Sequence, residues 1–83
     1  MSDNGERRKF RIDLIKREII MAWERGIQTI DFKSLEANYC YKLGISKRSF
    51  KEYLDIALYL INGEIVNGQI KYKNGEQKQL PTV

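Results

Sequence analysis

A short run of hydroxyl and cationic side chains, Ser46-Lys47-Arg48-Ser49 followed by Lys51, could bind anions. The guanidinium of Arg48 is a planar fork that matches the two hydrogen-bond acceptors on the major-groove edge of guanine. Lys47 and Lys51 suit either a phosphate or a base. Ser46 and Ser49 would meet phosphates near a helix N-terminus, where the helix dipole favours negative charge. The sequence therefore predicts an anion-binding helix start, with Arg48 as the best candidate for a base contact.

Two carboxylates follow on the side of the same helix that should face away from the core. Glu52 and Asp55 would repel phosphate. They could accept hydrogen bonds from cytosine, or form ordinary intrahelical ion pairs with Lys51 and Arg48. We expect the ion pairs.

The chain contains one cysteine and no histidine, which limits its chemistry. A Cys–His or Ser–His catalytic pair is impossible, zinc lacks ligands, and the single Cys40 cannot form an internal disulfide. We expect no enzyme activity, no metal and no cofactor, and a reducing, cytoplasmic location. The polar start of the chain does not resemble a signal peptide, and no apolar run approaches the roughly 20 residues that span a bilayer. We therefore expect no membrane association.

The anion-binding residues sit in a helix–turn–helix pattern. Leu35, Tyr39 and Leu43 recur at the spacing of one helix face. Gly44 favours the left-handed conformation that ends a helix, and Ser46 is a favoured N-cap for the next one. The second helix is predicted over residues 46–61, with an apolar stripe made of Phe50, Leu54, Ala57 and Ile61.

The remaining pattern predicts one domain over residues 8–73. A first helix should run from about residue 8 to 25 and end at Gly26. Its core face consists of Ile12, Ile15, Ile19, Ala22 and Trp23. Residues 27–32 should form a brief strand or an extended connector. Residues 1–7 are predicted to be a disordered tail and residues 74–83 a flexible one.

Residues 64–73 predict a β-hairpin with Asn67-Gly68 as its two-residue turn. That turn pairs Val66 with Gln69 and Ile65 with Ile70. Ile65, Ile70 and Tyr72 should then share the face toward the core.

The turn and the order of elements resemble the winged helix-turn-helix family of DNA-binding proteins. Cys40 supplies the small residue before the turn, and Gly44, Ile45 and Ser46 supply the turn, the corner plug and the cap. The resemblance implies an α+β fold of three helices, with a short strand after the first and a C-terminal two-stranded wing. It also implies that helix 46–61 enters the major groove of double-stranded DNA and that hairpin 64–73 touches the flanking backbone. This wing is shorter than in long-winged relatives.

Positive charge gathers where such a protein would meet phosphates. The net charge is +4, with six basic residues against two acidic ones over residues 6–17, and five against one over residues 33–51. Candidate backbone contacts are Lys33 and Lys42 beside the second helix, and Lys71 and Lys73 on the hairpin. Arg7, Arg8, Lys9 and Arg11 could form a basic arm. The alternative is that these basic side chains are ordinary surface residues that contact only water.

The first helix also has a second apolar side, made of Phe10, Leu14 and Met21. Such a side is either covered by the rest of the chain or meets a partner. We expect a homodimer through these residues, with the hairpin or the tail as the alternative cover. A symmetric dimer would read two half-sites about 34 Å apart.

These features predict sequence-specific DNA binding by a small transcriptional regulator that acts by occupying its site. The short chain, rich in Ile, Lys and Tyr, is similar to small regulators from archaea, their viruses or plasmids. A winged-helix module that binds proteins is one alternative, since fold does not fix function. A weakly specific architectural protein that binds nucleic acid is another.

Overall fold

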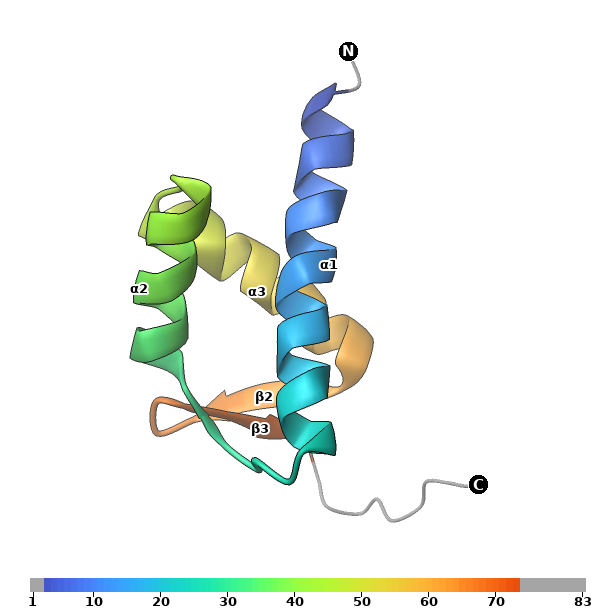
Figure 1. Cartoon of the computed structure of the whole chain (residues 1–83), viewed down its shortest axis with the longest axis vertical. Helices are drawn as coiled ribbons and strands as arrows, with labels where there is room; N and C mark the ends of the chain where they lie inside the picture. Colours follow the sequence, from blue (N-terminus) through green and yellow to red (C-terminus); the bar gives the residue numbers. More distant parts are fainter. Residues whose placement is uncertain (1–2, 74–83) are drawn as a thin grey trace.

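The computed structural model describes residues 3–73, which form three helices and a three-stranded antiparallel sheet (Figure 1). The elements in chain order are α1 (Asp3–Glu24), β1 (Ile30–Asp31), α2 (Phe32–Leu43), α3 (Lys47–Ile61), β2 (Gly63–Val66) and β3 (Gln69–Tyr72). This part of the chain is a small α+β domain, as predicted. The predicted C-terminal tail lies outside the described residues.

Helix α1 begins five residues earlier than predicted, so the expected tail of residues 1–7 is helical from Asp3 onward. The small and polar residues at the start of the chain had suggested a disordered tail. However, Glu6, Arg7, Arg8 and Lys9 are good helix formers and extend a helix that is already anchored on the core. That anchor is the predicted face: Ile15 and Ile19 are fully buried, Ile12 is nearly so, and Trp23 is half-buried.

The turn between α2 and α3 forms as predicted. Asp31 caps α2 by accepting a hydrogen bond from the Ser34 amide at 2.9 Å. Gly44 ends α2 in the left-handed conformation, with φ of 66° and ψ of 37°. Ser46 then caps α3, and Asn62 ends it in the left-handed conformation. Local capping chemistry therefore fixes both ends of the two helices.

The hairpin has the predicted register, with Val66 opposite Gln69 and Ile65 opposite Ile70. The predicted short strand is present as β1, and it pairs with β3 to give the sheet order β1-β3-β2. Ile70 is fully buried and Ile65 is half-buried, whereas Tyr72 remains 43% exposed. Tyr72 nevertheless packs edge-on against Trp23, with ring centroids 5.5 Å apart.

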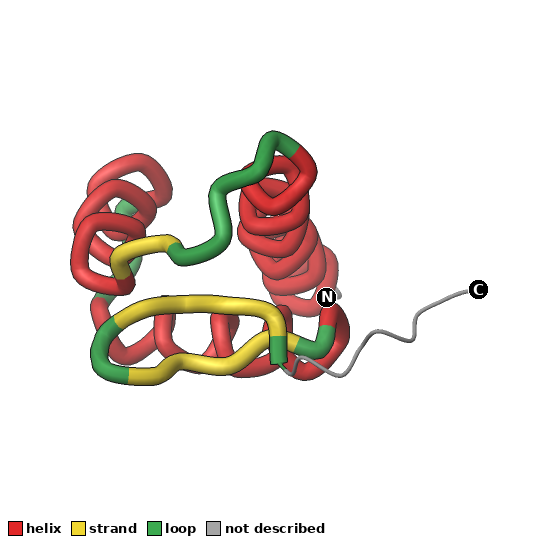
Figure 2. Tube along the Cα trace, turned by 90° about the horizontal axis from the view of Figure 1, so that it is seen from below, coloured by secondary structure: helices red, strands yellow, loops and turns green. Residues whose placement is uncertain are grey.

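One core joins the helices to the sheet. Phe50 lies at its centre and contacts Tyr39 and Phe32, with ring centroids 6.2 Å apart in both pairs. Helix α1 packs mainly on α3, which passes behind it in Figure 1. The hairpin covers one end of the helices (Figure 2). The opposite end, where α2 turns into α3, carries the predicted anion-binding residues.

Candidate nucleic-acid interface

The start of α3 combines a capping hydroxyl with free backbone donors. The Ser46 hydroxyl oxygen accepts a hydrogen bond from the Ser49 amide at 3.1 Å, and the two hydroxyls lie 3.2 Å apart. The first intrahelical backbone bond runs from the Phe50 amide to the Ser46 carbonyl. The amides of Lys47 and Arg48 precede that bond, so they point out of the helix end and can meet an anion.

The exposed side of α3 carries the predicted cations. Lys47, Arg48 and Lys51 are all exposed, as are Glu52 and Asp55. Lys51 pairs with Asp55 at 3.3 Å across one helical turn, which confirms one of the expected intrahelical ion pairs. Within residues 3–73, Lys47 and Arg48 form no ion pair. These two cations are therefore available to a ligand, while Lys51 must first leave a weak surface pair.

The four predicted backbone lysines do not lie together: two belong to α2 and two to the part of the hairpin that follows its turn. Lys42 lies in the last turn of α2, beside α3, with Nζ 5.0 Å from the centre of the Tyr39 ring. Lys33 lies in the first turn of α2, about 14 Å away at 1.5 Å per residue. Lys71 and Lys73 belong to the hairpin end, and Lys71 is half-buried opposite Glu64. Lys42 alone of these lysines lies beside the start of α3.

The hairpin is fastened to α2. The Phe32 amide donates a hydrogen bond to the Gly68 carbonyl at 2.9 Å, which holds the hairpin turn at the start of α2 (Figure 2). The turn is the expected two-residue type, with positive φ at Asn67 and Gly68. Its attachment brings Lys33 next to the hairpin, and the turn does not project as a separate arm.

The arginines at the start of α1 lie against α3, a proximity that sequence reasoning missed. Arg7, Arg8 and Arg11 line a shallow pocket of about 260 Å³ together with Glu52 and Tyr53. The charge count had marked these arginines, but no local pattern gave their distance from α3. Packing of α1 on α3 makes them neighbours of the exposed α3 side.

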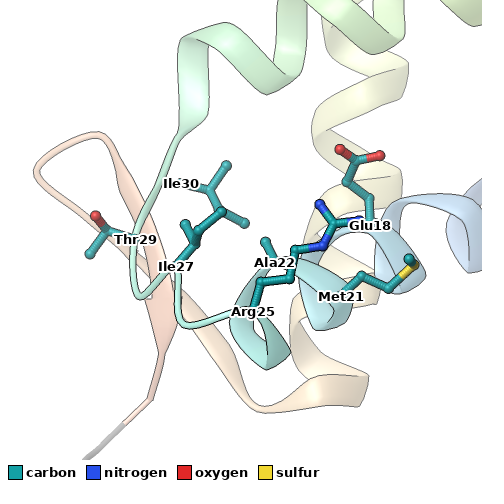
Figure 3. A pocket seen from close by; sticks show the side chains of 7 residues that line it. All are labelled: Glu18, Met21, Ala22, Arg25, Ile27, Thr29 and Ile30. Atoms are coloured by element: carbon teal, nitrogen blue, oxygen red, sulfur yellow. The ribbon is translucent and has the colours of Figure 1, made fainter.

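A second, larger pocket lies at the other end of α1 and has a different character. It holds about 390 Å³ between the last turns of α1 and the connector to β1. Figure 3 shows Arg25 and Glu18 reaching along the same side of α1, with Ile27 and Ile30 across from them. Its mixed charge and apolar walls do not favour a polyanion.

The predicted dimer face is only partly free. Phe10 and Met21 are 61% and 43% exposed, and no element among residues 3–73 buries them. Leu14, the third residue of this predicted face, is half-buried and packs against the core. The Tyr39 side chain of α2 reaches the same part of α1, with its hydroxyl donating a hydrogen bond to the Leu14 carbonyl at 3.5 Å.

Several other site types find no support in the described residues. Among residues 3–73, no three His, Cys, Asp or Glu side chains gather closely enough to hold a metal ion. None of the helices in this part of the chain combines the length and apolarity needed to cross a bilayer. Comparisons with protein-family models, curated proteins and solved structures found no match to this chain. A functional proposal therefore depends on the chain's own residues.

Proposed function

We propose that this protein binds double-stranded DNA in a sequence-specific way and acts as a winged helix-turn-helix regulator that occupies its site. The observation that carries the proposal is the start of α3, where Lys47 and Arg48 are exposed beside outward-pointing amides. Helix α3 would enter the major groove, whose width of about 12 Å admits one helix. The β2–β3 hairpin would lie at the flanking backbone.

The arrangement of elements supports this assignment. A short turn held by Gly44 and Ser46 sets α3 across α2, and the hairpin follows α3 directly. Lys42 lies beside the start of α3 and would contact phosphate, while Lys33, Lys71 and Lys73 would reach phosphates farther along the backbone. Phosphate contacts would supply affinity, and base contacts by Arg48 would supply sequence preference.

A test of this proposal compares two single-charge variants. A preferred site is first selected from random duplex DNA, and binding is measured to that site and to a scrambled duplex. Arg48→Ala should weaken binding to the selected site by about 1–3 kcal/mol and reduce the preference for it. Arg25→Ala, at the far end of α1, removes the same charge and should change neither. Equal effects of the two variants would contradict the assignment of Arg48.

A protein-binding module is the second candidate. It is favoured by Glu52 and Asp55 on the exposed side of α3 and by Tyr59, which is 85% exposed on the same helix. The double variant Arg48→Ala/Lys51→Ala separates the two functions. Loss of duplex binding with an intact fold supports DNA recognition, whereas unchanged duplex binding removes α3 from the DNA interface.

A further inference from the structure

The pocket between α1 and α3 gathers positive charge from three arginines of α1. Arg7, Arg8 and Arg11 fall within about one turn of α1 and share the pocket with Tyr53 and a single carboxylate, Glu52. The pocket volume of about 260 Å³ is several times the roughly 30 Å³ occupied by a water molecule in the liquid, so a phosphate group has room there.

Two other cations of α1, Lys9 and Lys16, are already paired with a carboxylate. Lys9 and Lys16 lie 3.5 and 3.6 Å from the Asp13 carboxylate, and these three residues line a separate groove against Ile56 and Leu60 of α3. Among the side chains of residues 5–73, no carboxylate forms such a pair with the three pocket arginines. Arg11 is also half-buried as a residue, so its side chain is held along the α1–α3 junction with its charge at the pocket.

The position of the pocket matches the rim of a groove that holds α3. A helix with its side chains is about 10–12 Å wide and the major groove is about 12 Å wide, so the flanks of an inserted helix meet the phosphate strands. Glu52 and Tyr53 lie in the second turn of α3, and Glu52 is one turn after Arg48. A phosphate strand passing this flank would meet the three arginines.

We propose that Arg7, Arg8 and Arg11 form a phosphate-binding site that holds one strand of the DNA backbone beside α3. The site rests on the DNA-binding function proposed above and adds α1 to the interface. Arginine suits it because its guanidinium can donate two hydrogen bonds to one phosphate. Tyr53 also lines the pocket, and its hydroxyl would be a further donor to a bound phosphate. Glu52 opposes binding and limits the affinity of the site.

The test measures binding of the full chain to a fluorescent random-sequence duplex across a salt series. The double variant Arg7→Ala/Arg11→Ala should lower the dependence of log K on log salt concentration by about 2, because each lost phosphate contact removes about 0.9. Affinity at low salt should fall at least tenfold. Arg25→Ala should bind like the wild type. Thermal unfolding followed by circular dichroism checks that each variant is folded.

Two further variants separate charge from structure. Arg7→Lys/Arg11→Lys keeps both charges and should keep the wild-type salt dependence. Glu52→Gln should tighten binding, because it removes the one negative charge in the pocket. The site is overturned if the alanine double variant has the salt dependence of Arg25→Ala while Arg48→Ala still weakens binding, or if the lysine variant loses as much as the alanine variant. If the wild type itself does not bind the duplex, the proposed function fails as well.

Discussion

At the scale of single residues, Tyr39 links all three helices. It belongs to α2, its ring stacks on Phe50 of α3, and its hydroxyl donates a hydrogen bond to the Glu18 carboxylate of α1 at 2.9 Å. Burial, together with the hydrogen bond to Glu18 and the negative charge of that carboxylate, raises the pKa of the Tyr39 phenol well above its usual range. The fold therefore keeps this hydroxyl protonated under conditions in which an unfolded chain would release the proton.

That shift predicts a specific alkaline instability. Because the pKa of Tyr39 is raised in the folded protein, its stabilising effect is complete below the ordinary tyrosine value of 10.0 and is lost as the pH rises above it. One proton corresponds to a slope of at most about 1.4 kcal/mol per pH unit. Urea unfolding from pH 9 upward should show this decline in the wild type and a shallower one in Tyr39→Phe. Parallel curves for the two proteins would contradict the role given to Tyr39.

At the scale of elements, the features that could be predicted from the sequence are those fixed by near neighbours. Gly44 and Ser46 set the turn before α3 through caps within a few residues, and Asn67-Gly68 sets the hairpin register. The pairing of β1 with β3 joins residues about 40 positions apart, and a two-residue strand carries too little pattern to specify its partner. The same limit applies to the site: the cations of α3 could be predicted, but the placement of Arg11 beside α3 depends on how two helices pack.

Gly63, at the start of β2, lies too close to neighbouring side chains to accept a Cβ atom without strain. A Cβ atom at Gly63 would lie 2.8 Å from Cδ2 of Leu58 and 3.2 Å from Cη2 of Trp23, closer than packed carbon atoms allow. Gly63→Ala should therefore lower the free energy of unfolding by about 1–3 kcal/mol, as overpacked core substitutions do. Chemical denaturation measures the change.

Gly5→Ala provides the matched control for that substitution. Gly5 lies in α1, and a Cβ there would have no heavy atom within 4 Å. Because alanine favours a helix more than glycine does, this variant should be unchanged or more stable by up to about 1 kcal/mol. Equal stability of Gly63→Ala and the wild type would show that the hairpin can move away from α3 at little cost.

At the scale of the whole molecule, the exposed side of α1 predicts self-association. Phe10 and Met21 are exposed three turns apart on one side of the helix. An antiparallel pairing of two α1 helices would bring Phe10 of each copy to Met21 of the other. Such a pair would be symmetric, with the same surface used by both copies.

Light scattering after size-exclusion chromatography tests this arrangement. The wild type should elute as a dimer, and Phe10→Ser/Met21→Ser should elute as a folded monomer. Tyr59→Ser removes an exposed aromatic from α3 instead and should leave the dimer intact. A wild type that remains monomeric up to high concentration would rule out the dimer and leave each copy of the protein to bind DNA alone.

The start of α3 and its flanking cations are proposed to form a surface for DNA phosphates. The most direct measurement is the affinity of the wild type for a random-sequence duplex as the salt concentration rises. We predict dissociation constants near the micromolar range at low salt, which is the range of non-specific DNA binding, with a steep loss of affinity as salt is added. An absence of binding at low salt would contradict the account and would direct attention to a protein partner on the exposed side of α3.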